Sequence, residues 1–142
     1  MPQTTVSIRT LQGATAALGW SNGRSVSIDR PATAGGLGIG FNGGELLLLA
    51  VGACYCNDLF REAGKMNLKI TSVELQVDAN WGGDPVRATD LAFSVKVAGP
   101  ASKEDIEKLI RLTDQVAEIP NSLRYGTEVT LRSYEAISTE TA

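Results

Sequence analysis

Alternation of apolar and polar positions predicts strands at the start of the chain. It occurs at positions 6–8, 14–20 and 26–28. Between the last two lies Asn22-Gly23, a dipeptide that favours a tight turn because both residues tolerate positive φ. Pro31 ends the third run. The first thirty residues therefore read as a meander of short strands.

Two longer alternating runs follow in the second half of the chain. They cover positions 73–81 and 91–97, and Gly82-Gly83-Asp84-Pro85 separates them. This pattern predicts an antiparallel hairpin with one buried face. Val129 and Leu131 indicate one further strand near the C-terminal end.

A long helix is predicted between the meander and the hairpin, over residues 45–63. Glu45 suits its first turn, where the helix dipole favours an acid, and Gly64 is a suitable C-cap. The helix carries Cys54 and Cys56, the only two cysteines of the chain. Its N-terminal half is apolar nearly all round, so it needs cover on most sides.

A second helix is expected after the hairpin, with Ser102 as its N-cap and acids at Glu104 and Asp105 in the first turn. Apolar positions recur between 106 and 117 at helical spacing, which makes this helix amphipathic. Pro120 is expected to end it.

These elements predict one α+β domain over residues 1–142, with a mostly antiparallel sheet, a long buried central helix and a second amphipathic helix. One sheet and two helices give too little cover for a central helix that is apolar on nearly every side. A second subunit packed on that helix is the economical solution.

Composition narrows the function classes. The net charge is −3, which gives no electrostatic attraction to nucleic acid or to anionic membranes. No histidine is present, so His-based acid–base catalysis and the commonest metal ligand are excluded, and we expect no metal site and no cofactor. The glycine-rich segment 32–44 lacks the spacing of a dinucleotide fingerprint and the lysine of a P-loop.

The expected location is the cytoplasm. The first ten residues do not read as a leader peptide, and the apolar run 46–56 is shorter than the ~20 residues that a membrane span needs. The cysteines are then expected to be reduced thiols. Free cysteines are often inert packing residues, so this structural role stays open for both.

Helix geometry limits the chemistry of the thiols. A buried cysteine has a raised pKa and becomes a reactive thiolate only beside a fixed positive charge. Glu45 lies nine residues before Cys54, about 13.5 Å along the axis and on the opposite face, so the two cannot touch. Asp58 and Arg61 share the Cys54 face; Asp58 would oppose a thiolate and Arg61 is two turns away. Cys56 points away from Cys54, which favours packing over an intramolecular disulfide.

The segments Asp29-Arg30-Pro31 and Gly44 to Cys54, with the glycine loop between them and the later hairpin and Ser-Lys-Glu-Asp helix, resemble the OsmC-like family. That family comprises osmotically inducible protein C and the organic hydroperoxide resistance proteins. The resemblance implies an intertwined homodimer with active sites at the subunit interface. It implies that Cys54 is the peroxidatic cysteine and that Glu45 is the acid that holds an arginine near the thiolate.

Two departures from the family pattern concern recycling and activation. The family's second cysteine precedes a proline in the later helix, and here Ile119 stands before Pro120. The implied recycling is then by an external thiol. Arg24 is the first candidate for the activating arginine and Arg30 the second, and neither has the Gly-Gly-Arg context of the hydroperoxide resistance branch.

Two functions follow as hypotheses. The first is a thiol-dependent peroxidase that reduces organic hydroperoxides in oxidative stress defence, with Cys54 as nucleophile and Glu45 and Arg24 in support. The second is a non-catalytic dimer of the same fold that binds a small apolar ligand at the subunit interface.

Overall fold

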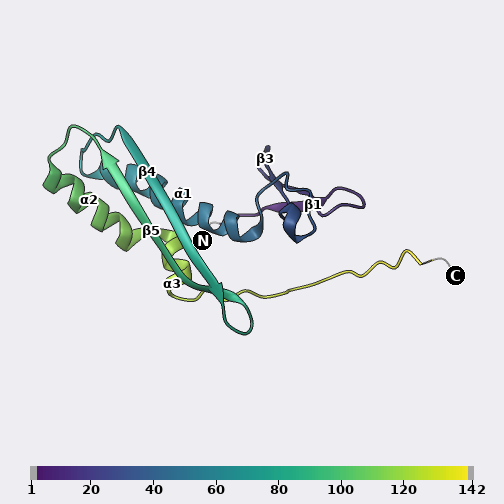
Figure 1. Ribbon diagram of the computed structural model, residues 1–142. Coiled ribbons are helices and arrows are strands. Elements are labelled where there is room, and N and C mark those ends of the chain that lie inside the picture. The colour runs from purple at the N-terminus through teal and green to yellow at the C-terminus, as the bar shows by residue number, and fades with distance from the viewer. Residues whose placement is uncertain (1–2, 141–142) are drawn as a thin grey trace.

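The computed structural model describes residues 3–140 and shows two antiparallel sheets and three α-helices (Figure 1). This confirms the α+β class with antiparallel sheets. The elements in chain order are β1 (Ser7–Thr10), β2 (Ala17–Ser21), β3 (Arg24–Ile28), the 3₁₀ turn η1 (Ala32–Ala34), α1 (Gly43–Lys65), β4 (Ser72–Gly82), β5 (Arg87–Ala98), α2 (Lys103–Val116) and α3 (Glu118–Arg124).

The N-terminal meander is a three-stranded sheet in the order β1-β2-β3. The predicted turn joins β2 to β3, with φ of 49° at Asn22 and 75° at Gly23, the left-handed conformation that these residue types accept most readily. Figure 1 shows this sheet at the N-terminal end of α1, away from the hairpin.

The β4–β5 hairpin carries the main packing face. Its register runs from Ser72 opposite Ala98 to Gly82 opposite Arg87, with one irregularity at Asn80 and Trp81. Alternate side chains along both strands are half-buried, as the sequence pattern predicts. α1 packs against β4, and α2 lies beside α1 and touches β5.

α1 begins with a reciprocal cap. The Asn42 side chain accepts a hydrogen bond from the Glu45 backbone N–H at 2.9 Å, and the Glu45 carboxylate accepts one from the Asn42 N–H at 2.9 Å. This capping box satisfies two N–H groups that a helix start leaves free. The helix runs past Gly64, the predicted cap, to Lys65, and Met66 is the C-cap. The left-handed turn that follows is made by Asn67 with φ of 55°.

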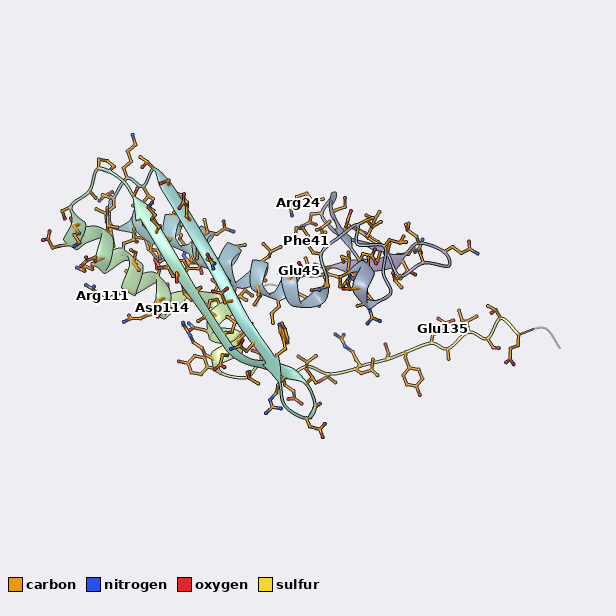
Figure 2. All side chains as sticks on the ribbon, in the orientation of Figure 1. Arg24, Phe41, Glu45, Arg111, Asp114 and Glu135 are labelled. Atoms are coloured by element: carbon orange, nitrogen blue, oxygen red, sulfur yellow. The ribbon has the colours of Figure 1, made fainter. Side chains whose placement is uncertain are left out.

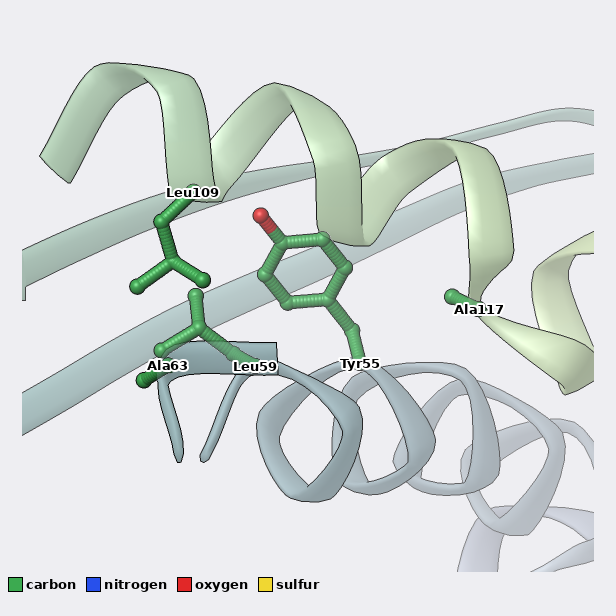
Figure 3. Close-up of a cluster of buried hydrophobic side chains, with 5 residues drawn as sticks. All are labelled: Tyr55, Leu59, Ala63, Leu109 and Ala117. Carbon is green, nitrogen blue, oxygen red and sulfur yellow. The ribbon is translucent and has the colours of Figure 1, made fainter. Parts of the chain in front are cut away.

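The core joins the C-terminal half of α1 to α2 (Figure 3). The Tyr55 ring tilts against Phe93 of β5 at a centroid distance of 4.9 Å, and its hydroxyl donates to the Ile110 carbonyl of α2 at 2.9 Å. Burial raises the pKa of Tyr55 to about 12, so the phenol stays a neutral donor. The fully buried members of this cluster are Tyr55, Leu59, Ala63, Leu109 and Ala117.

The N-terminal half of α1 is incompletely covered. Leu49 is 50% exposed, whereas Leu59 in the other half is fully buried. One chain therefore leaves this half of the helix without full cover, as its apolar pattern predicts. α1 is long and apolar enough to pass a length-and-composition test for a membrane span. Core helices of soluble proteins pass the same test.

The C-terminal part of the chain corrects two further predictions. α2 ends at Val116, and Pro120 does not end a helix but lies in the first turn of α3, where its missing N–H leaves no helical bond unmade. Val129 and Leu131 lie in no strand, and they are 94% and 81% exposed. Their segment extends away from the body, where no sheet edge of the described chain reaches it (Figure 1).

Candidate functional site

The two cysteines lie on different faces of α1, as helix geometry predicts. Cys54 faces the start of α3, because the backbone N–H of Ile119 donates to the Cys54 sulfur at 3.3 Å. Cys56 lies on the other side, in the wall of a groove. Both thiols are free and half-buried.

The Cys54 sulfur has a second polar contact within its own helix. Its thiol donates to the Asp58 carboxylate at 3.5 Å, one turn further along α1. Asp58 Oδ2 also accepts the Glu118 N–H at 3.4 Å. The first two N–H groups of α3 are thus directed at a carboxylate and a sulfur of α1. Ala117, which breaks α2 from α3, gives the chain the change of direction that allows this.

A guanidinium completes this network. Arg61 lies 3.2 Å from Asp58 and 3.2 Å from Glu118. The Asp58 side chain is only 10% exposed, whereas the Arg61 side chain is 41% exposed. The prediction that Asp58 and Arg61 share the Cys54 face is confirmed. Arg61 does not reach the sulfur directly; it acts on the carboxylate that does.

These surroundings keep Cys54 protonated in the single chain. Burial raises the pKa of its thiol above the usual value, and the nearby Asp58 charge raises it further. The Ile119 N–H works in the opposite direction and lowers the pKa of Cys54, but burial outweighs it. The resting group is therefore a thiol with an acceptor at its proton and a donor at its sulfur.

Glu45 and Arg24 lie elsewhere. Glu45 is engaged in the cap of α1, and Arg24 on β3 borders an apolar hollow that Val6 and Trp20 also line. Within residues 3–140, neither side chain makes a hydrogen bond or an ion pair with Cys54. Figure 2 shows Arg24, Phe41 and Glu45 together at the N-terminal end of α1. The single chain thus does not assemble the three predicted site residues.

Arg30, the second candidate arginine, has a structural environment that the sequence did not reveal. Its backbone N–H donates to Oδ1 of the neighbouring Asp29 carboxylate at 2.7 Å. Thr15 Oγ1 donates to the same Asp29 oxygen at 2.8 Å. The N–H groups of Leu37 and Ile39 donate from the glycine-rich segment at 2.9 and 3.3 Å. The signal that could have found this is an acid just before a glycine-rich loop.

Two apolar cavities flank α1. One, of 490 Å³, lies between α1 and β4 and is lined by Phe41, Glu45, Leu48, Leu49, Gly52, Ala53, Cys56, Leu75 and Val77. Cys56, for which the sequence favours a packing role, lies in the wall of this groove. The other cavity, of 330 Å³, lies between α1, β5 and α3. Its walls include Val51, one turn before Cys54, and Pro120, which follows Ile119.

No group of three or more metal-ligating side chains occurs among residues 3–140. The site described above consists of the Cys54 thiol, the carboxylates of Asp58 and Glu118, the Arg61 guanidinium and two backbone N–H groups.

Solved structures share this fold. The OsmC-like protein of Mycoplasma pneumoniae superposes with a TM-score of 0.76 at 16% identity, over 89% of this chain and 89% of the other. A putative osmotic stress induced and detoxification response protein of Psychrobacter arcticus gives 0.72 at 18% identity, over 86% and 89%. The organic hydroperoxide resistance protein OhrB of Bacillus subtilis gives 0.62 at 20% identity, over 87% and 92%. At these identities the likeness shows the fold.

No curated protein matches the sequence. The model of the OsmC-like protein family, however, matches residues 35–132, which include α1 with both cysteines, the hairpin, α2 and α3. This match covers more than half of the chain and agrees with the shared fold. The chain therefore belongs to the OsmC-like protein family.

Proposed function

We propose that this protein reduces organic hydroperoxides with Cys54 as the nucleophile and an external thiol as the reductant. The observation that carries the proposal is the position of the Cys54 sulfur at the α1–α3 junction, between a backbone N–H at 3.3 Å and a carboxylate at 3.5 Å. A donor and an acceptor on one thiol sulfur suit a group that must lose a proton and bear charge during reaction.

The reaction oxidises sulfur by two electrons. The Cys54 sulfur attacks the terminal hydroxyl oxygen of the hydroperoxide, the S–O bond forms and the O–O bond breaks. The products are a cysteine sulfenic acid and the alcohol, which receives the thiol proton. An external thiol then condenses with the sulfenic acid, releasing water, and a second equivalent reduces the mixed disulfide.

The 330 Å³ cavity whose walls include Val51, one turn before Cys54, and Pro120, next to Ile119, favours an organic substrate over hydrogen peroxide. Its lining is mostly apolar, with Leu47 and Val51 from α1 and Leu91 and Phe93 from β5. An alkyl or aryl group placed there would leave its peroxide group near the α1–α3 junction. Hydrogen peroxide would gain nothing from such walls.

Ile119 supports recycling by an external thiol. Its backbone nitrogen is a direct neighbour of the Cys54 sulfur, so this position lies where a second cysteine could reach the nucleophile. An isoleucine side chain forms no disulfide, which leaves the sulfenic acid to a thiol from solution.

The proposal includes a homodimer. The half-exposed face of α1, the extended segment after α3 and the exposed apolar side chains of β1–β3 all lack cover in one chain. Glu45 and Arg24 would contribute to the chemistry only if the second subunit brings them to Cys54. In that case the Glu45 carboxylate would hold the Arg24 guanidinium near the sulfur while keeping its own cap bond.

The test combines peroxide consumption with trapping of the sulfenic acid. The protein is incubated with an excess of dithiothreitol and cumene hydroperoxide, and separately with dimedone, which labels sulfenic acids. We expect turnover and a dimedone adduct on Cys54, both lost in Cys54→Ser. Cys56→Ser is the matched control, since Cys56 lies on another face of the same helix. Absence of both turnover and adduct in the unsubstituted protein would contradict the proposal.

The second candidate function is binding of a small apolar ligand without catalysis. The 490 Å³ groove beside Cys56 favours it, because apolar side chains from α1 and β4 make up most of its walls. An apolar fluorescent dye displaced by straight-chain fatty alcohols, together with no peroxide turnover, would support this function over the first.

A further inference from the structure

Asp58 accepts a hydrogen bond from the Cys54 thiol, but the reaction as proposed above gives its carboxylate no role during the attack. Its carboxylate is 10% exposed and lies 3.5 Å from the Cys54 sulfur. A negative charge beside a nucleophilic sulfur opposes thiolate formation, so a site selected only for a stable thiolate would not place one there.

The carboxylate is held in place from two sides. Arg61 pairs with Oδ1 at 3.2 Å, and the Glu118 N–H donates to Oδ2 at 3.4 Å. Oδ2 is also the atom that accepts the Cys54 thiol. Asp58 Oδ2 therefore has a fixed position relative to the thiol proton, and the charge of Asp58 is balanced by Arg61, which in turn pairs with Glu118.

The acidity of the thiol changes during the attack. A neutral thiol that forms a bond to oxygen develops positive charge on sulfur, and its S–H becomes strongly acidic. A carboxylate is basic enough to take that proton while the S–O bond forms. The leaving alkoxide is a far stronger base and takes the proton from the carboxylic acid.

We propose that Asp58 is a catalytic residue that accepts the Cys54 proton during attack on the hydroperoxide and passes it to the leaving alkoxide. The sulfur lone pair forms the S–O bond, the O–O pair leaves with the alkoxide, and the proton moves from sulfur to Asp58 and then to the alkoxide. The products are the sulfenic acid and the alcohol, and Asp58 returns to its carboxylate form.

The neighbours of Asp58 have separate roles in this step. The Ile119 N–H stabilises negative charge on the sulfur at 3.3 Å. Arg61 is a positioning residue, since it contacts Asp58 and not the sulfur. The charged groups around Cys54 are thus Asp58 and Arg61 on α1 and Glu118 on α3. In this arrangement the attack starts from the protonated cysteine and does not depend on Arg24 reaching the sulfur from a second subunit.

The inference rests on the proposed function, and the experiment separates the two. Cys54 is reacted under single-turnover conditions with iodoacetamide and with tert-butyl hydroperoxide, in Cys56→Ser protein with and without Asp58→Asn. Iodoacetamide reports the thiolate fraction, and the peroxide reports proton transfer as well.

The two reagents should respond in opposite directions. Loss of the Asp58 charge lowers the pKa of Cys54, so Asp58→Asn should alkylate faster at pH 7. Its reaction with the hydroperoxide should slow by about 100-fold, the usual contribution of a positioned base. A role of Asp58 in folding alone would slow both reactions or neither.

Glu62→Gln is the matched control. Glu62 is also a buried acid of α1, one turn after Asp58, and it pairs with Lys65 at 3.0 Å. Both rates should stay within about twofold of the parent protein, because a group without contact to the reacting atoms adds little.

If Asp58→Asn does not fold, as judged by circular dichroism, Arg61→Gln takes its place. It should slow the hydroperoxide reaction by about 3- to 10-fold, and Arg61→Lys should restore part of the rate. Faster reaction of Asp58→Asn with both reagents, or an unchanged peroxide rate in Arg61→Gln, would overturn the inference. No peroxide reaction in the parent protein would instead overturn the proposed function.

Discussion

The two halves of α1 differ in how far a single chain completes their surroundings. In the C-terminal half, Tyr55, Leu59 and Ala63 are buried against α2 and the hairpin. In the N-terminal half, Leu49 is half exposed and an open groove runs along the helix. The N-terminal half is the more apolar of the two, because Asp58, Arg61 and Glu62 lie in the C-terminal half, so composition alone would predict the opposite difference. It comes from the elements that follow: α2 packs on the C-terminal half, whereas α3 meets the N-terminal half only across the cavity that Leu47 and Val51 line.

The site lies where these halves meet. Cys54 is anchored to α3 by the Ile119 N–H and to α1 by Asp58, so it has two polar partners within the single chain. Cys56, two residues later, faces the open groove. The rotation between neighbouring helix positions separates the two thiols. Tertiary contacts decide that Cys54, and not Cys56, receives a hydrogen bond from α3.

The largest expected effect on stability comes from a substitution in the C-terminal half of α1, which the single chain covers. Leu59→Ala should destabilise the protein by about 3 kcal/mol, because it removes a fully buried side chain from a packed cluster. Chemical unfolding monitored by circular dichroism measures this. Leu49→Ala is the matched control on the same helix, and its effect should depend on protein concentration if a second subunit covers that face. If both variants lost the same stability at every protein concentration, the two halves of α1 would not differ in how far one chain covers them.

A charge on the open half should separate the subunits. Leu49→Asp would place a carboxylate in the surface that we propose to be covered, and an unpaired buried charge is costly. Light scattering should show a dimer for the parent protein and a folded monomer for the variant. A parent protein that is monomeric at micromolar concentration would contradict the proposed dimer.

The junction between the halves can be tested with a second thiol. Ile119→Cys should form a disulfide with Cys54 on mild oxidation, since the Ile119 nitrogen lies 3.3 Å from the Cys54 sulfur. Mass spectrometry of the unreduced protein would show the bond, and turnover with a poor external thiol should rise. Ser122→Cys, one turn further along α3, is a control that should give less of the bond. Similar amounts in both variants would mean that the junction is mobile.

The smallest effect concerns the segment leading into α1. Burial acts to raise the pKa of Asp29, but hydrogen bonds from Thr15, Ile39, Arg30 and Leu37 outweigh it and lower the pKa below its usual 3.8. An acid with a lowered pKa in the folded state stabilises the fold above its unfolded pKa, and this contribution is lost as the pH falls through the folded value. The urea midpoint should therefore drop below about pH 4 in the parent protein and change less in Asp29→Asn. If the parent protein and Asp29→Asn lost stability equally at low pH, other carboxylates would be responsible for the loss.

Much of the fold follows from local pattern. The Asn22-Gly23 turn, the 73–97 hairpin and the Ser102 cap of α2 could be predicted because each depends on neighbouring residues only. The pattern predicts Glu45 in the first turn of α1 but not its capping partner Asn42. The prediction that Pro120 ends a helix is wrong because a proline suits a first helical turn as well as a helix end.

The candidate site could be predicted only as far as one helix reaches. The sequence by itself determined that Cys54, Asp58 and Arg61 share a face and that Cys56 does not, because the helical repeat is a property of the backbone. Only the tertiary structure decided that α3 brings the Ile119 N–H to the sulfur, across 65 residues of chain. Such long-range pairing depends on how the hairpin and α2 return the chain to α1, which local pattern does not encode.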